Sequence, residues 1–353
     1  MKTISRLISA ATNLALTFGL VFLMKTYPQP AQQLYPRVSQ WILGAVGSVT
    51  AKIPLPLWEI MVVLGVLWLI FTLIRAIRKL KFLRWVSGVV WTASFLLFTF
   101  VLFWGGGHLL PTKTEQILTM EEYSVETLAE ATSFFAGKLD EAATAVDRDA
   151  EGKPKMAEFS RLAEQAAEDC NALSDRYSVL PRVEALTAKK LLGGPIFGYL
   201  GVTGIFVPLT AEATVSPHTY PASLPFTICH EMSHRLGACA EEDANFLAFL
   251  ACVDSGDIQF RYSAWYSAFL YCYNSLYEAS PETAAAIVSG MTPQARADMF
   301  QSVEHYKPYE GPVQEAADKV NDTYLKAAGQ EAGIRSYGLV SDALVSWYRQ
   351  NAA

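Results

Sequence analysis

Acidic residues are almost absent from the first 104 residues of this 353-residue chain, where Glu59 is the one exception. The same stretch holds ten Lys and Arg residues and carries a net charge of +9. Residues 105–353 hold 18 basic and 33 acidic residues, a net charge of −15, and the two sums give the overall −6. An acidic second part argues against nucleic-acid binding, which needs a basic surface. A basic, apolar beginning before an acidic remainder is typical of a membrane anchor that carries a water-exposed domain.

Cysteine is also scarce, and no CxxC pair occurs. An odd number of cysteines without such pairs is not the pattern of a disulfide-built scaffold, although one or two bridges remain open for a domain outside the cytoplasm. We interpret each cysteine as a small, buried, apolar residue. The five are Cys170, Cys229, Cys239, Cys252 and Cys272.

Three apolar stretches, near residues 7–24, 57–76 and 85–104, have the length and composition of transmembrane helices. The first follows Lys2 and Arg6 and resembles a signal peptide, but the two later stretches favour an uncleaved first span. Trp85 and Trp104 suit the two membrane–water boundaries. We therefore predict a membrane anchor over residues 1–107, in which Gly105–Gly107 forms a flexible break at the membrane exit.

The basic residues predict the orientation of this anchor. The link between the second and third stretches contains no acid, and short basic loops stay in the cytoplasm. The N-terminus, with Lys2 and Arg6, agrees with this placement. Three spans that start inside leave residues 108–353 on the extracytoplasmic side of the cell membrane. The basic residues of the link are Arg75, Arg78, Lys79, Lys81 and Arg84.

The segment Thr227–Gly237 contains the motif His-Glu-x-x-His, formed by His230, Glu231 and His234. On a helix this spacing places both imidazoles on one face, one turn apart, where they can bind one Zn²⁺. The glutamate after the first histidine is then positioned to take a proton from a water molecule at the metal. Ser223 is expected to cap this helix, with Pro225 in the first turn, and Gly237 to end it.

Two histidines do not complete a catalytic zinc site, which needs a third protein ligand. Position 240, where a metzincin would have a histidine, is Ala240. Three acids follow and begin a second helix, and Gly237 permits a turn that folds one of them back to the metal. The residues alone leave the choice open among Glu241, Glu242 and Asp243. A partly buried histidine pair beside helix-favouring acids is the alternative without a metal.

Glu241-x-x-Ala244-Asn245 resembles the element by which some gluzincin peptidases present their third ligand. The segments 220–237 and 241–252 resemble the DUF3810 family, bacterial membrane proteins with an HExxH domain and an uncharacterised function. Segments 261–264, 320–326 and 336–338 are similar to it too, so the resemblance covers most of the chain. It implies a zincin-like site with His230 and His234 as ligands, Glu231 as base and Glu241 as third ligand.

The rest of the second part predicts mostly helices with a few short strands. Gly, Pro and β-branched residues indicate a small hairpin within residues 191–215, just before the motif. The predicted fold is an α-helical anchor plus a mainly α, α+β zincin-like metallopeptidase domain with a small β-sheet, over residues 108–353. Its helices are expected near residues 120–147, 157–177, 262–279, 281–289, 293–305, 311–328 and 336–350.

The predicted function is a membrane-anchored zinc metallopeptidase with a peptide or protein substrate, and cell-wall cross-links and membrane-protein loops also fit. Glu231 is the expected general base. An intramembrane protease is disfavoured, because the motif helix is short and three acids follow it. The alternative from another class is a membrane-anchored sensor or binding protein with a structural or vestigial zinc site. A residue that stabilises the developing oxyanion stays open among His218, His305, Tyr306 and Tyr337.

Overall fold

The structure is a computed structural model that describes residues 2–182, 186–327 and 337–352. The chain forms two compact units. The first consists of Met1–Leu110 together with Val207–Glu212, and the second of Pro111–Phe206 and Ala213–Ala353. Most of the described residues are helical in both units.

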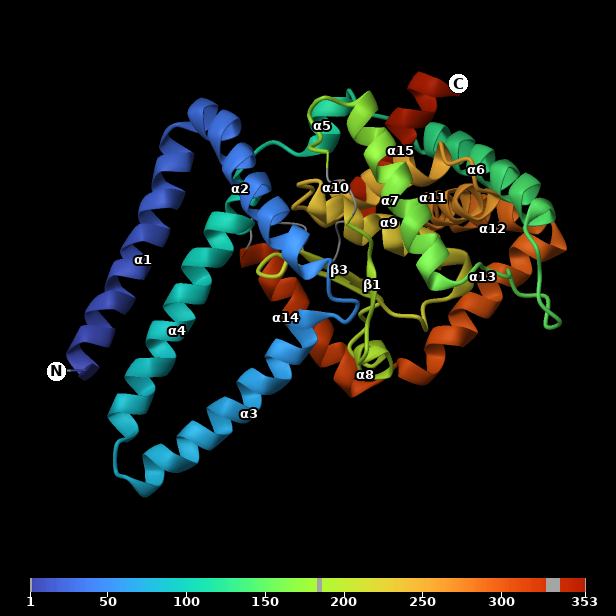
Figure 1. Cartoon of the computed structure of the whole chain (residues 1–353). Helices are drawn as coiled ribbons and strands as arrows, with labels where there is room; N and C mark the ends of the chain where they lie inside the picture. The colour runs from blue at the N-terminus through green and yellow to red at the C-terminus, as the bar shows by residue number, and fades with distance from the viewer. Residues whose placement is uncertain (1, 183–185, 328–336, 353) are drawn as a thin grey trace. The chain divides into compact units, whose positions relative to one another are not determined.

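Four long helices build the first unit (Figure 1). They are α1 (Lys2–Thr26), α2 (Pro28–Thr50), α3 (Leu57–Arg78) and α4 (Phe82–Phe103). Helices α1, α3 and α4 are long and apolar enough to cross a membrane, and they cover the three predicted spans except for Trp104. Helix α2 was not predicted as a helix, because polar residues and proline interrupt its apolar pattern; Pro36 lies inside it.

The surface of the first unit fits a lipid environment. Every residue of α3 from Met61 to Phe71 is exposed, and nearly all of them are large and apolar. Such a continuous apolar face is unfavourable in water and is stable against lipid chains. Small buried residues bring α1 against α4, among them Ala10 and Ser87. The amide of Asn13 donates to Ser94 Oγ across this contact at 3.2 Å.

The glycines at the end of α4 are packed, so the prediction of a flexible break at Gly105–Gly107 was wrong. They form a 3₁₀ helix, η1 (Gly105–Leu109). A Cβ atom on Gly106 would lie 2.6 Å from the ring of Tyr35, and one on Gly105 would lie 2.7 Å from the ring of Phe100. Glycine is therefore required here for close approach between side chain and backbone.

The turn Val207–Glu212 belongs to the first unit through specific hydrogen bonds. The hydroxyl of Thr50 donates to the carbonyl of Thr210 at 3.0 Å. The backbone N–H groups of Leu57 and Trp58 each donate to one carboxylate oxygen of Glu212, both at 2.9 Å. Glu212 thus caps the start of α3, where the preceding Pro56 offers no side-chain cap.

The second unit has a helical core around α9 (Leu224–Arg235), α10 (Glu241–Val253) and α11 (Ile258–Ala279). Most residues of α9 and α10 are buried, and rings such as Phe249 and Trp347 fill the space beside them. The surrounding helices are α5 (Lys113–Ile117), α6 (Val125–Ala145), α7 (Phe159–Arg176), α8 (Gly194–Gly198), α12 (Pro281–Gly290), α13 (Pro293–Tyr306), α14 (Pro312–Ala327) and α15 (Tyr337–Asn351), with the 3₁₀ helices η2 (Pro221–Ser223) and η3 (Lys307–Tyr309).

A three-stranded sheet precedes α9, in the order β1 (Lys189–Lys190), β3 (Glu212–Val215), β2 (Gly204–Val207). Strands β2 and β3 form the predicted hairpin, and β1 pairs with β3 in parallel. The earlier part of the same stretch, around Phe197, was expected to be strand-like but forms the short helix α8. The strand β1 was not predicted, because two residues carry no readable alternation. Among the described residues, β2 has a neighbour on one side alone and is therefore an edge strand.

Candidate metal centre

Helix α9 presents the histidine pair as the spacing predicted. Pro225 lies in its first turn, and Gly237, with a φ of +94°, follows its end in the left-handed conformation. The predicted cap by Ser223 was wrong: Ser223 has helical dihedral angles and makes no side-chain cap. The reason is that the 3₁₀ turn η2 leads directly into α9, so the chain is already helical at this point.

A short turn after α9 brings the following residues back beside the helix face that carries His230 and His234. The N–H groups of Gly237 and Ala238 donate to the carbonyls of His234 and Ser233, at 3.0 and 3.2 Å. Ala240 is extended, and Glu241 is the first residue of α10. Because α9 and α10 pack against each other, the side chain of Glu241 reaches the histidines from the neighbouring helix.

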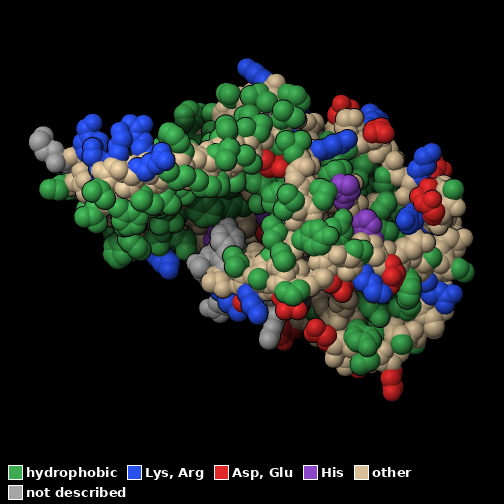
Figure 2. Space-filling view, turned by 90° about the horizontal axis from the view of Figure 1, so that it is seen from below, with side chains coloured by type: hydrophobic (Ala, Val, Ile, Leu, Met, Phe, Trp, Pro, Cys, Tyr) green, Lys and Arg blue, Asp and Glu red, His purple; other side chains and the backbone are tan. Residues whose placement is uncertain are grey.

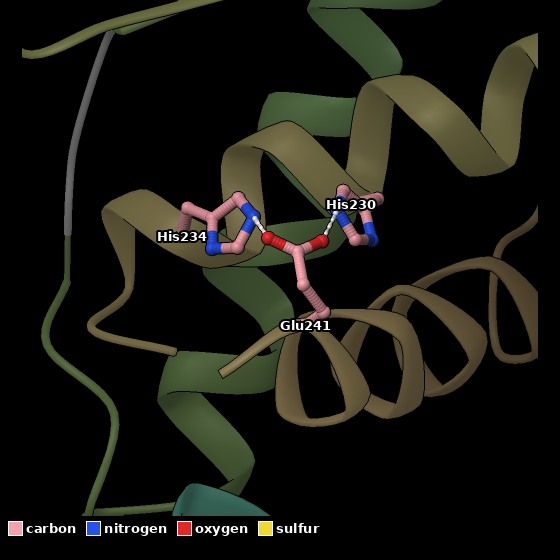
Figure 3. A group of neighbouring side chains, drawn as sticks. All are labelled: His230, His234 and Glu241. Carbon is pink, nitrogen blue, oxygen red and sulfur yellow. Dashed lines mark ion pairs between the residues drawn. The ribbon is translucent and has the colours of Figure 1, made fainter. Parts of the chain in front are cut away.

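The three side chains converge on one point, as Figure 3 shows. Glu241 Oε2 lies 3.2 Å from His230 Nε2, and Glu241 Oε1 lies 3.6 Å from His234 Nε2. One ligand atom from each residue can be chosen so that all lie within 4.8 Å of one another. In a tetrahedral site with metal–ligand bonds near 2.1 Å, two ligand atoms are about 3.4 Å apart. The two separations between Glu241 and the histidines are close to that value, so these residues could hold a metal ion.

Hydrogen bonds behind the histidines fix their orientation. His234 Nδ1 donates to the carbonyl of Ala238 at 2.7 Å, and His230 Nδ1 lies 2.7 Å from Asn245 Oδ1. Asn245 Oδ1 also accepts the hydroxyl of Tyr271 at 3.0 Å. With hydrogen on both Nδ1 atoms, both Nε2 atoms carry the free lone pairs that a metal requires.

The sequence reasoning assigned no role to Asn245 or Tyr271. Asn245 lies four residues after Glu241 and thus on the same face of α10, which is the signal that could have identified it. Tyr271 lies on α11 and gives no such signal, because its place beside Asn245 follows from the packing of α10 on α11.

Burial and neighbouring charges shift the pKa values of the site residues. Burial lowers the pKa of His230, but its hydrogen bond to Glu241 and the charges of Glu231 and Glu241 outweigh it and raise that pKa to about 9. Burial and the nearby Glu241 charge raise the pKa of Glu231 to about 8, although His230 opposes them. A buried carboxyl with a raised pKa is able to take up a proton near neutral pH.

Glu231 lies against the edge strand β2. A Cβ atom on Gly204 would be 2.4 Å from Glu231 Oε1, so a larger residue here would force this carboxyl to move. Glu231 is 4% exposed, and its Oε2 has no hydrogen-bond partner within the described part of the chain. A buried carboxylate oxygen without a partner is costly, and such groups are common where a protein handles protons.

The structure separates the three acids that the sequence left open. Asp243 turns away from the histidines and accepts the N–H groups of Lys113 and Thr114, at 2.9 and 2.7 Å. It thereby binds the start of α5. Glu242 is not part of the group that could hold a metal, and Glu241 is. Glu241 is also the most exposed of the three potential ligands, at 38% of its side chain, so the site opens to solvent on that side.

Three of the residues named for oxyanion stabilisation, His218, His305 and Tyr306, take part in hydrogen bonds near the start of α9. His305 Nε2 bonds the carbonyl of His218 at 2.6 Å, and the hydroxyl of Tyr306 accepts the N–H of Tyr220 at 2.9 Å. These bonds connect α13 to the loop before α9. Neither His218 nor His305 belongs to the metal-binding group. The side chain of Tyr337 lies outside the described part.

The cysteines are free in the described chain, and four of the five are buried. Cys229 directly precedes His230 and is fully buried on another side of α9, as expected.

Comparison with known proteins identifies a family and no relative of known activity. The model of the family described as "Protein of unknown function (DUF3810)" matches residues 32–345. No curated protein and no solved structure matches the chain.

Proposed function

The chain belongs to the DUF3810 family, whose function is unknown, and from its candidate metal centre we propose that it is a membrane-anchored zinc metallopeptidase. The observation that carries the proposal is the group His230, His234 and Glu241, which could hold a metal ion with Glu231 beside it. Two imidazoles and one carboxylate are the ligand set of catalytic zinc sites that keep a fourth position open.

The proposed fold of the second unit is zincin-like. In support, an edge strand precedes the helix with the histidine pair, and the third ligand comes from the next helix. When bound, zinc would supply a Lewis acid that lowers the pKa of a water molecule and polarises a carbonyl group.

The residues of the chain have separate tasks in this proposal. His230 and His234 bind through Nε2, held by Asn245 and the Ala238 carbonyl. Glu231 takes a proton from the attacking water and delivers it to the leaving amine nitrogen. The carboxylate form takes the proton in the first step, and the carboxyl group holds it until the second.

Strand β2 supports a peptide as the substrate. An extended peptide can add to an exposed sheet edge by main-chain hydrogen bonds. Gly204 on this edge lies directly against Glu231, so a peptide on β2 would bring its backbone close to the base. We propose an extracytoplasmic location for the site, with cytoplasmic basic ends of α1, α3 and α4.

The test uses the full-length protein in lipid nanodiscs, loaded with zinc and given a library of quenched fluorescent peptides. We expect cleavage that a chelator abolishes and added zinc restores. Glu231→Gln should reduce kcat by about a hundredfold to ten-thousandfold while one zinc per chain remains bound. Glu278→Gln, at an exposed position of α11, is the matched control and should cleave normally.

Each other outcome changes the conclusion. Absence of stoichiometric metal from the wild-type protein would overturn the metal centre. Cleavage that survives Glu231→Gln would remove the proposed base. Bound zinc without hydrolysis of any peptide would favour the sensor or binding protein with a structural zinc.

A further inference from the structure

The basic residues of the first unit gather at one end of its helices. Of the ten Lys and Arg residues in the first 104, seven lie at the start of α1, the end of α3, the following turn and the start of α4. Figure 2 shows Lys and Arg side chains grouped at one end of a hydrophobic surface. The seven, here called the basic cluster, are Lys2, Arg6, Arg75, Arg78, Lys79, Lys81 and Arg84.

Backbone and side-chain contacts bring these segments together. The N–H of Lys81 donates to the carbonyl of Ala76 at 2.8 Å and closes the turn between α3 and α4. The Trp85 indole N–H donates to Thr72 Oγ1 at 3.1 Å across the same two helices. Arg6 Nη1 donates to the carbonyl of Arg84 at 3.1 Å, which joins the start of α1 to the start of α4.

No acid of the described residues pairs with this cluster. None of its members forms a salt bridge among the described residues. Glu59, the one acid of the first 104 residues, lies in the first turn of α3. It is 16 residues before Arg75 on the same helix, about 24 Å away at 1.5 Å per residue. The seven positive charges are therefore available to an anionic ligand from outside the chain.

The surroundings indicate what kind of ligand. Large apolar side chains stand exposed between the basic residues: Leu80 is 94% and Leu83 is 79% exposed. Alternation of cations with exposed apolar side chains suits the boundary between lipid headgroups and acyl chains. A soluble anion would leave the leucines in water, whereas a phospholipid covers both kinds of side chain.

Two features suit the basic cluster to binding a phosphate group. Arg6 is held in place, with its guanidinium against Gly88, where a Cβ atom would be 3.2 Å from Nη1. Its other N–H groups can still form the forked hydrogen bonds that a phosphate accepts. Helix α4 also begins here without a side-chain cap, so its positive dipole end adds to the attraction.

We propose that the basic cluster binds the phosphate headgroup of an acidic phospholipid, with Arg6, Lys81 and Arg84 at the centre of the site. The inference is independent of the proposed peptidase activity, because it concerns the first unit alone. Each basic residue near a membrane surface adds attraction to acidic lipids, so the retained lipid should depend on the number of charges in the cluster.

The test places the full-length protein in nanodiscs of phosphatidylcholine with about 30% phosphatidylglycerol, so that the membrane surface is negatively charged. Native mass spectrometry then measures which lipids stay bound to the protein. We expect the protein to retain phosphatidylglycerol over phosphatidylcholine. The triple variant Arg6→Gln, Lys81→Gln, Arg84→Gln should lose this preference about tenfold or more. The matched control, Lys25→Gln, Arg37→Gln, Lys52→Gln, removes the other three cations of the same stretch and should change it less than twofold.

A second variant keeps the test decisive if the triple variant does not fold. Arg78→Gln with Lys79→Gln changes two exposed side chains of the cluster and should lower the preference at least threefold. Equal retention of both lipids by the wild-type protein would overturn the proposal, as would an equal loss in the matched control. Displacement of phosphatidylglycerol by millimolar inorganic phosphate would identify a soluble-phosphate site and overturn the lipid assignment.

Discussion

At the scale of single residues, Asn245 illustrates how the site depends on groups that touch no metal. Its side chain oxygen accepts from His230 and from Tyr271. We expect Asn245→Ala to weaken zinc binding about tenfold to a hundredfold, the usual effect of losing a partner behind a ligand. Competition with a fluorescent zinc chelator measures the affinity. Asn274→Ala, at an exposed position of α11, is the control, and an equal loss in both variants would contradict the positioning role.

Gly204 tests the placement of Glu231. An alanine methyl group would come within 2.4 Å of Glu231 Oε1 and force the carboxyl to move. Gly204→Ala should lower kcat by about a hundredfold, the cost of displacing a reacting group by roughly 1 Å. Zinc content should stay the same, because the ligands do not touch this position. The control is Gly256→Ala, which should retain full activity because a Cβ atom there meets nothing within 4 Å. An unchanged kcat in Gly204→Ala would refute the claim that a side chain at this position displaces Glu231.

Asp169 gives a pH-dependent prediction for stability. Burial raises the pKa of this carboxyl from 3.8 to about 6, although hydrogen bonds from Ser255 and Gln165 oppose the rise. The folded protein then holds a proton that the unfolded chain has released, so the free energy of unfolding falls as pH rises from about 4 to about 6. Above pH 6 the charged form is present in both states, and the loss is complete.

We expect Asp169→Asn to remove that loss and to be more stable than the wild type at pH 7, by roughly 1–2 kcal/mol. Denaturant titrations of the full-length protein in detergent at pH 4.5 and 7.5 provide the comparison. Glu168→Gln, its exposed neighbour, should keep the wild-type pH dependence. The same pH dependence in Asp169→Asn and wild type would show that Asp169 is not the group responsible.

At the scale of elements, the start of α3 depends on a residue 155 positions further along the chain. Both oxygens of Glu212 accept N–H groups there, and Glu212 is 1% exposed. Glu212→Gln keeps the shape but replaces one acceptor with a donor and removes the charge that favours a helix start. We expect a loss of about 1–2 kcal/mol in the stability of the full-length protein.

Thermal unfolding in detergent measures this loss. Glu310→Gln, at an exposed position, is the control and should leave the midpoint unchanged. An unchanged midpoint in Glu212→Gln as well would mean that the cap contributes nothing to stability.

The same elements show what the sequence could predict. The histidine pair and the end of α9 follow from local rules, since His230 and His234 lie one turn apart and Gly237 takes a positive φ. Which of the acids lies beside the histidines does not follow from such rules. Asp243 is directed elsewhere because α5 supplies N–H groups to it, and Glu241 lies beside the histidines. The contact between Gly204 and Glu231 depends on how a strand crosses a helix, which no spacing in the chain reveals.

At the scale of the whole molecule, composition identified the apolar helices correctly, because membrane spans need length and hydropathy alone. It did not predict that Val207–Glu212, inside the second half of the chain, belongs to the first unit. That assignment rests on hydrogen bonds between distant residues such as Thr50 and Thr210. The family match covers residues 32–345 and so includes both units.

The most direct test of the central claim is X-ray absorption spectroscopy at the zinc edge on the full-length protein, purified with zinc. We predict one zinc per chain with nitrogen and oxygen ligands at about 2.0–2.2 Å, two of them imidazoles. Glu241→Ala should remove one oxygen ligand, and His230→Ala should remove one imidazole. A zinc bound by sulfur, or no stoichiometric zinc at all, would contradict the account.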